Sequence, residues 1–237
     1  MGPFQVALYV FCRGTCNLIF QLIYRRIILH KDRIPTVGPV LLVANHQSHF
    51  DPPAIGGCMD RRSCSFLARE SLFHNPLFGW LIRSLNSVPV KGTAADTGSM
   101  KVILQRLESG SPVLIFPEGS RTFDGAMQPF LRGASLLIKR SGCATIPVAI
   151  DGAFDAFPRT AKFPRLFGQR IAVSYGTPIS AEELLADGPN AAIDRLALEV
   201  DALRMECRAA LRERTGGRIP AEGPGDARID LEALKAD

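Results

Sequence analysis

Short apolar runs alternate with amphipathic stretches through the middle of this 237-residue chain. Residues 40–44 contain no polar side chain, and similar runs occur at residues 112–116 and 144–150. An unbroken apolar run of this length is typical of a strand buried on both faces of a parallel sheet. The stretches between the runs have helical spacing, as at residues 97–107. The alternation predicts an α/β fold: a three-layer sandwich with a largely parallel sheet flanked by helices.

Weaker patterns add further elements to this prediction. Pro89 lacks an N–H donor, so the strand that contains it is expected near an edge of the sheet. Turn and capping residues delimit the other elements. We expect strands at residues 65–68, 88–90 and 171–175, and helices at residues 78–85, 130–140 and 191–214.

The first 33 residues differ in character from the rest. Apolar side chains dominate residues 4–29, but polar and basic ones interrupt them. Each apolar stretch is therefore shorter than the roughly 20 residues that a membrane span needs. We expect one or two helices lying in a membrane interface, with a break at residues 13–15. A basic cluster would face the lipid headgroups: Arg25, Arg26, His30, Lys31 and Arg33. A helix hairpin that belongs to the core is the alternative.

Composition completes the domain prediction. We expect a membrane-associating helical segment at residues 1–33, an α/β domain at 34–214 and a flexible, Gly-, Pro- and charge-rich tail at 215–237. The six cysteines form no C-x-x-C pair, which favours reduced thiols. The formal net charge of +5 suits an anionic partner. No helix-turn-helix, zinc or RNA-recognition signature is present in the sequence, so nucleic acid is not an expected partner.

Residues 45–51 follow the first predicted strand and contain the first candidate for chemistry. The neutral imidazole of His46 can take a proton at physiological pH. Asp51 can hold the other ring nitrogen and fix its tautomer. Five residues of helix rotate by about 500°, which takes the two side chains off a common face, so they can meet only across a turn.

Two simpler interpretations of this segment stay open. Asp51 can act only as the N-cap of a helix that begins at Pro52. His46, His49 and Asp51 can instead bind a metal, although no H-E-x-x-H or comparable ligand set accompanies them.

Residues 116–122, Phe-Pro-Glu-Gly-Ser-Arg-Thr, follow another predicted strand. Gly119 lets the backbone approach a ligand closely. Arg121 offers a planar fork suited to phosphate, and Ser120 offers a hydroxyl. Glu118 could hold Arg121 or bind a substrate hydroxyl. Alone, the segment could be an ordinary turn, but with His46 it combines a base and an anion-binding group at the ends of strands in one sheet.

These motifs resemble those of the glycerolipid acyltransferase family, typified by 1-acyl-glycerol-3-phosphate acyltransferases. The family signature of a His, four residues and an Asp is present as His46 and Asp51, after Asn45. Further blocks follow in the family's order, and the resemblance covers about residues 30–180. The blocks are residues 66–73 with Asn75 and Pro76, residues 117–121, residues 130–134 and residues 145–150.

The resemblance implies transfer of an acyl group from acyl-CoA or acyl carrier protein to the free hydroxyl of a lysophospholipid, such as 1-acyl-glycerol-3-phosphate. His46 would be the general base and Asp51 its orienter, with no cofactor or metal beyond the thioester co-substrate. Many members carry an Arg shortly after a Val-Pro-Val-like strand, where this chain has Lys91, and this weakens the expectation of that particular acceptor. The acceptor and its phosphate would be bound by Arg69, Lys91, Glu118, Gly119, Ser120 and Arg121.

The expected location follows from the apolar and basic segments together. Residues 154–170 interleave phenylalanines with arginines and a lysine, which fits a lipid interface as well as single-stranded nucleic acid or a plain surface loop. Beside the apolar N-terminus, we favour an anionic membrane at its cytoplasmic face, bound peripherally or monotopically. Two competing functions are a hydrolase that acts through Ser48 or a metal, and a non-enzymatic peripheral membrane protein.

Overall fold

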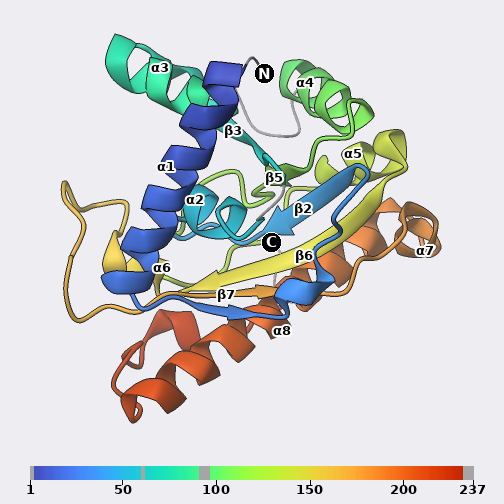
Figure 1. Cartoon of the computed structure of the whole chain (residues 1–237). Helices are drawn as coiled ribbons and strands as arrows, with labels where there is room; N and C mark the ends of the chain where they lie inside the picture. Colours follow the sequence, from blue (N-terminus) through green and yellow to red (C-terminus); the bar gives the residue numbers. More distant parts are fainter. Residues whose placement is uncertain (1–2, 60–61, 91–96, 232–237) are drawn as a thin grey trace.

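The structure, a computed structural model, describes residues 3–59, 62–90 and 97–231 (Figure 1). Its centre is a seven-stranded sheet in the order β1-β7-β6-β2-β5-β3-β4. The strands are β1 (Ile27–Leu29), β2 (Val40–Ala44), β3 (Ser65–Arg69), β4 (Ser87–Val90), β5 (Val113–Ile115), β6 (Ala144–Asp151) and β7 (Ala172–Tyr175). As expected from Pro89, β4 lies at an edge of the sheet.

The directions of the strands determine at which edge of the sheet the loops that follow them lie. β6, β2, β5, β3 and β4 pair in parallel, so their carboxyl ends meet at one edge of the sheet. β7 runs antiparallel to β6, and β1 runs parallel to β7. The predicted α/β fold with a largely parallel sheet is confirmed.

Alternation along β2 explains the two buried faces of the sheet. Leu41 and Val43 belong to one apolar core, whereas Val40, Leu42 and Ala44 belong to the other. Successive side chains of a strand point to opposite faces, so a strand between two helical layers needs apolar residues throughout. The unbroken run at residues 40–44 follows from this position.

Helices cover both faces of the sheet (Figure 1). α4 (Thr97–Glu108), α5 (Ala134–Ser141), α7 (Ala181–Leu185) and α8 (Pro189–Thr215) contribute to the first core. α1 (Pro3–Leu22), α2 (Asp51–Gly56) and α6 (Ala153–Ala156) cover the second, and α3 (Pro76–Ser84) packs near α1 and β4. Three short 3-10 turns complete the described elements: Lys31–Arg33, Glu70–Phe73 and Pro224–Asp226.

The N-terminal segment differs from the expectation in two ways. α1 is one continuous helix without a break at residues 13–15. A single glycine such as Gly14 makes a helix less stable by only about 1 kcal/mol relative to alanine. The residues after it form β1, whose Ile27 pairs with Ala172, so the α/β domain begins before residue 34. The pattern did not predict this strand, because three residues are too few to show a period.

The expected basic cluster is also divided by the structure. Arg26 is buried and donates to the Ala54 carbonyl and to Asn17. His30 contacts Glu206, and Arg33 donates to the Tyr175 carbonyl. These three side chains therefore hold the N-terminal segment to the domain, while Arg25 and Lys31 stay exposed.

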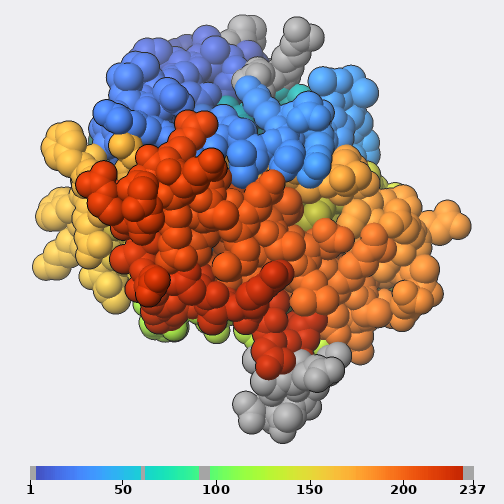
Figure 2. Space-filling view, turned by 90° about the horizontal axis from the view of Figure 1, so that it is seen from below, coloured from blue at the N-terminus to red at the C-terminus, as the bar shows by residue number. Residues whose placement is uncertain are grey.

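The C-terminal segment lies against α8 where a flexible tail was expected. Asp226 accepts from Arg208 at 2.7 Å and from Arg212 at 3.0 Å. Arg204 donates to the Ala227 carbonyl at 2.7 Å. α8 and the segment after it cover much of the face seen in Figure 2, where they are orange to red. Charge in this segment therefore serves ion pairing, which composition alone does not distinguish from a solvated tail.

Candidate active site

The candidate residues gather at the carboxyl edge of the parallel strands. Residues 45–50 connect β2 to α2, and residues 116–122 follow β5, the strand beside β2. Arg69 is the last residue of β3, on the other side of β5. The topology therefore brings three of the predicted segments to one edge of the sheet.

His46 and Asp51 meet across a turn, as their spacing requires. The His46 Nδ1 atom lies 2.7 Å from Asp51 Oδ2. The Asp51 side chain is fully buried, whereas that of His46 keeps 19% of its surface accessible. Asp51 bound to Nδ1 favours the tautomer that leaves Nε2 as the basic nitrogen, at the accessible end of the pair.

Asp51 is held by the turn that it closes. Besides His46, its Oδ2 atom accepts from the backbone N–H of Gln47 at 2.6 Å and of Ser48 at 2.7 Å. α2 begins at Asp51 itself, after Phe50 as the N-cap and without a side-chain capping bond. The interpretation of Asp51 as the N-cap of α2 is therefore wrong, because its carboxylate turns back to the preceding residues.

The two loops are joined by main-chain contacts. Glu118 Oε1 accepts from the His46 backbone N–H at 2.6 Å, and the Thr122 N–H donates to the His46 carbonyl at 2.9 Å. The Phe116 ring stacks on the His46 imidazole with centroids 4.0 Å apart. The imidazole is therefore held from its ring face, from its backbone and from Nδ1.

Glu118 has a different place from the one expected. Its other oxygen, Oε2, accepts from the Gln128 backbone N–H at 3.0 Å. Both carboxylate oxygens thus bind main chain, and neither contacts Arg121 in the described structure. Burial raises the pKa of Glu118 to about 8, against the lowering effect of the two N–H donors. Glu118 positions the His46 loop against the loop after β5.

Cations face this edge of the sheet. Arg121 is half-buried, and burial followed by the nearby Arg159 and Arg69 lowers its pKa, with Asp51 acting in the other direction. Gly119 has φ +72°, the left-handed conformation that glycine adopts without strain. Ser120 is half-buried in the same loop. The prediction for Lys91 falls outside the described residues.

Ser48 does not resemble a nucleophile. It is fully buried, and its hydroxyl donates to the Phe157 carbonyl at 2.8 Å and accepts from the Phe50 N–H at 3.2 Å. Its bonds fasten residues 154–160 to the His46 loop. This placement gives no support to a hydrolase that acts through Ser48.

His49 lies on the same loop, next to the cations. Its ring is 5.8 Å from that of Phe157. Desolvation, then the charges of Arg121 and His46, lower its pKa to about 4. His49 is therefore neutral near pH 7, and a bound anion would raise its pKa by opposing those charges.

A polar network behind the loop at residues 45–50 was missed by the sequence interpretation. Gln47 donates to Asp151 Oδ1 at 2.9 Å and accepts from the Phe154 N–H at 3.2 Å. Asp151 in turn pairs with Arg208 of α8, with 3.1 Å between Nη1 and Oδ2. The signal was the Asp at the end of a largely apolar strand, because a buried carboxylate needs a cation or donors nearby.

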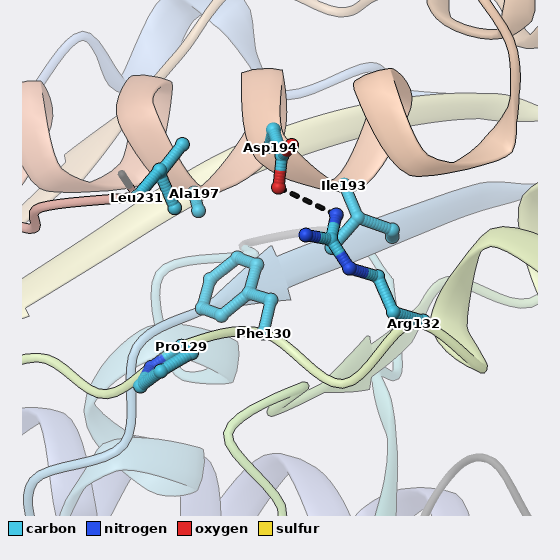
Figure 3. A pocket seen from close by; sticks show the side chains of 7 residues that line it. All are labelled: Pro129, Phe130, Arg132, Ile193, Asp194, Ala197 and Leu231. Atoms are coloured by element: carbon cyan, nitrogen blue, oxygen red, sulfur yellow. Dashed lines mark hydrogen bonds and ion pairs between the residues drawn. The ribbon is translucent and has the colours of Figure 1, made fainter. Parts of the chain in front are cut away.

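A small hollow lies away from this edge, between the loop before α5 and α8 (Figure 3). It has a volume of about 160 Å³, and Pro129 and Phe130 face Ile193 and Ala197 across it. Its charged groups, Arg132 and Asp194, pair with each other. The lining residues therefore leave no charge free for a ligand, in contrast to the cations near His46.

Comparison with known proteins identifies the family of the chain. The profile of the Acyltransferase family matches residues 26–151, which include both loops. The chain belongs to this family. A crystal structure of the 1-acyl-sn-glycerophosphate (LPA) acyltransferase from Thermotoga maritima has a similar fold, with a TM-score of 0.62, 23% identity and coverage of 81% of this chain and 80% of that one.

Relatives of known name include 1-acyl-sn-glycerol-3-phosphate acyltransferases. A chloroplastic one from Arabidopsis thaliana is 29% identical over 122 residues, which are 51% of this chain and 34% of the relative. One from Streptococcus pneumoniae is 27% identical over 179 residues, 74% of this chain and 64% of the relative. The matched region thus spans about a third to two thirds of these relatives.

Proposed function

We propose that this chain transfers an acyl group from an acyl thioester, carried by coenzyme A or acyl carrier protein, to the free hydroxyl of a lysophospholipid. The proposed acceptor is 1-acyl-glycerol-3-phosphate, and the product phosphatidic acid. The observation that carries the proposal is the His46–Asp51 pair, with 2.7 Å between Nδ1 and Oδ2. The names of the relatives and the nearby cations support the choice of acceptor.

The reaction follows from the orientation of the imidazole. His46 Nε2 takes the proton of the acceptor hydroxyl while its oxygen attacks the thioester carbonyl. The buried Asp51 carboxylate stabilises the imidazolium that forms. The tetrahedral intermediate collapses with cleavage of the C–S bond, and the proton passes from His46 to the departing thiolate. The new ester and a free thiol balance the reaction, and no acyl-enzyme is required.

The first experiment measures transfer of labelled acyl chains from acyl-CoA to 1-acyl-glycerol-3-phosphate. We expect His46→Ala to lower the rate by about 1,000-fold or more, and Asp51→Asn by about 100-fold or more, since such groups act as one unit. His74→Ala, at an exposed histidine in the turn before α3, is the matched control and should leave the rate unchanged.

Each contrary outcome has a definite meaning. Transfer that survives His46→Ala would exclude His46 as the base. Release of free fatty acid without transfer would favour the hydrolase. The absence of turnover with every acceptor and both donor types would favour the non-enzymatic membrane protein.

We further propose that α1 binds an anionic membrane surface. Large apolar side chains of α1 are exposed, among them Phe4 at 72% and Phe11 at 71%. α1 contains no acidic residue, and the exposed Arg25 follows it. An amphipathic helix of this kind lies in the headgroup region of a bilayer. No helix among the described residues is long and apolar enough to span a membrane.

Point substitutions test this better than deletion of residues 1–30, because that segment supplies core residues such as Phe20 and Tyr24. Phe4→Glu with Phe11→Glu should weaken binding to vesicles of phosphatidylcholine and phosphatidylglycerol by about 10-fold or more. Leu198→Glu, at an exposed apolar position of α8, is the control. Equal flotation of both variants would contradict the role of α1.

A further inference from the structure

One residue near the catalytic loop is assigned no role by the family match, which ends at residue 151. Arg159 follows α6 and is half-buried. Its guanidinium donates through Nη1 to the Arg121 carbonyl at 2.9 Å. The same group lies 3.8 Å from the centroid of the Phe123 ring. A backbone bond and a ring together fix the guanidinium plane beside Arg121.

The segment that carries Arg159 is attached to the His46 loop. Ser48 donates to the Phe157 carbonyl, and the Phe157 ring lies 5.3 Å from that of Phe50. Arg159 is two residues further along the chain. Its backbone is therefore tied to the same turn that holds His46 and Asp51.

Charge near Arg159 is unbalanced. None of the ion pairs among the described residues includes Arg69, Arg121 or Arg159. Burial and then the charge of Arg159 lower the pKa of Arg121, so the two guanidiniums repel each other. Like charges held close together are unfavourable until an anion lies between them. The arrangement is suited to a doubly charged ligand.

Arg159 retains donors for such a ligand. A guanidinium has five N–H groups, and the bond to the Arg121 carbonyl uses one of them. Arginine stacked on an aromatic ring keeps its edge available for planar, two-point contact with phosphate. Phe123 is 70% exposed, so the stack lies at the surface, where a ligand can enter.

We propose that Arg159 is a phosphate-binding residue that acts with Arg121 and Arg69 and sets the preference for a phosphate-bearing acceptor. This inference rests on the proposed acyl transfer. We assign the phosphate to the lysophospholipid; coenzyme A carries phosphate groups of the same chemistry. Their separate contributions are distinguished by the choice of donor below.

The first measurement is direct binding of sn-glycerol 3-phosphate. Binding is monitored by NMR through the resonances of the His49 ring as the ligand is added. Arg159→Gln should weaken binding by about 10- to 100-fold, the value expected for a charge-assisted hydrogen bond. Arg159→Lys should recover part of the loss. Arg165→Gln is the matched control, because Arg165 lies in the same segment and donates to the Asp155 carbonyl at 3.2 Å. It should bind like the unmodified protein.

The second measurement is turnover with two acceptors, 1-acyl-glycerol-3-phosphate and the phosphate-free 1-acylglycerol, from a phosphate-free acyl-N-acetylcysteamine donor. Arg159→Gln should lower kcat/KM for the first acceptor at least about 10 times more than for the second. A loss confined to reactions with acyl-CoA would place the phosphate on the donor and overturn the acceptor assignment.

Other outcomes separate this inference from the proposed function. Equal losses on both acceptors, or unchanged binding of sn-glycerol 3-phosphate, would reduce Arg159 to a support for the Arg121 loop and overturn the inference. Binding that depends on Arg159 in a protein without any transferase activity would refute the proposed function and leave the phosphate site standing.

Discussion

The arginines of this chain fall into two groups with opposite surroundings. On α8, Arg204 and Arg208 pair with the buried carboxylates of Asp201, on the same helix, and of Asp151, the last residue of β6. At the carboxyl edge of the sheet, Arg121 and Arg159 lie near other cations, outside every ion pair of the described part of the chain. Both groups are partly or fully buried, so accessibility does not separate them.

The two groups differ in what neutralises their positive charge. A buried charge pair that satisfies itself contributes to the fold, and its loss leaves one charge stranded in a medium of low dielectric. A set of like charges destabilises the empty protein slightly and becomes favourable when an anion arrives. The first group is therefore expected to govern stability, and the second to govern binding.

The largest expected effect belongs to the paired group. Arg204→Met leaves Asp201 buried without one of its partners, and should lower the free energy of unfolding by about 3–5 kcal/mol. Urea denaturation measures this, with kcat/KM of the folded fraction nearly unchanged. Arg195→Met is the control, since its pair with Glu183 is exposed and contributes below about 1 kcal/mol. An equal loss of unfolding free energy in both variants would contradict the role of the buried pair in stability.

The next effect belongs to the unpaired group. Arg121→Lys keeps the charge but loses the planar fork, and should lower kcat/KM for 1-acyl-glycerol-3-phosphate by about 10- to 100-fold. The loss on a phosphate-free acceptor should be clearly smaller, and the denaturation midpoint should not fall. A similar loss on both acceptors would remove the phosphate role from Arg121.

A third effect is the pH dependence of the free energy of unfolding that the buried Glu118 causes. Since burial raises its pKa to about 8, the folded protein keeps a proton that the unfolded chain releases near pH 4.5. Stability from this group is therefore fully present below about pH 4.5 and is lost as the pH rises through 8. Glu118→Gln should lack this decline when urea unfolding is compared at pH 5 and pH 8.5. Parallel slopes for the two proteins would contradict the raised pKa.

The smallest expected effect concerns the partly exposed pair of Arg132 and Asp194 at the hollow of Figure 3. Arg132 is 46% exposed, so solvent screens its attraction to Asp194. Asp194→Asn should change the free energy of unfolding by less than about 1 kcal/mol and leave acyl transfer as it is. A larger effect on turnover would give this region a part in function that its paired charges do not suggest.

Much of the fold could be predicted because buried parallel strands leave a local trace. The apolar runs at residues 40–44, 112–116 and 144–150 predicted β2, β5 and β6 without any knowledge of which residues are in contact. β1 was not, because its three residues pair with β7 far along the chain. Local pattern carries no information on such a partner.

The site divides in the same way. Residue types and spacing predicted His46 and Asp51, since a base and its orienter require those groups. They did not predict where the Glu118 carboxylate points, because a carboxylate serves main-chain donors and side-chain cations equally well. The place of Arg159 beside the site was not predicted for a related reason. Its neighbours Arg121 and Phe123 come from another loop, which is distant in the sequence.

The pairing of β1 with β7 also has a consequence for the order of events during synthesis. Ile27 meets Ala172, a partner made about 145 residues later. At about 5–20 residues per second, the ribosome needs roughly 7–30 s to supply that partner. Throughout this interval the edge of the sheet stays open while α1 has already emerged. The contact of α1 with a bilayer that we propose can therefore form before the sheet is complete.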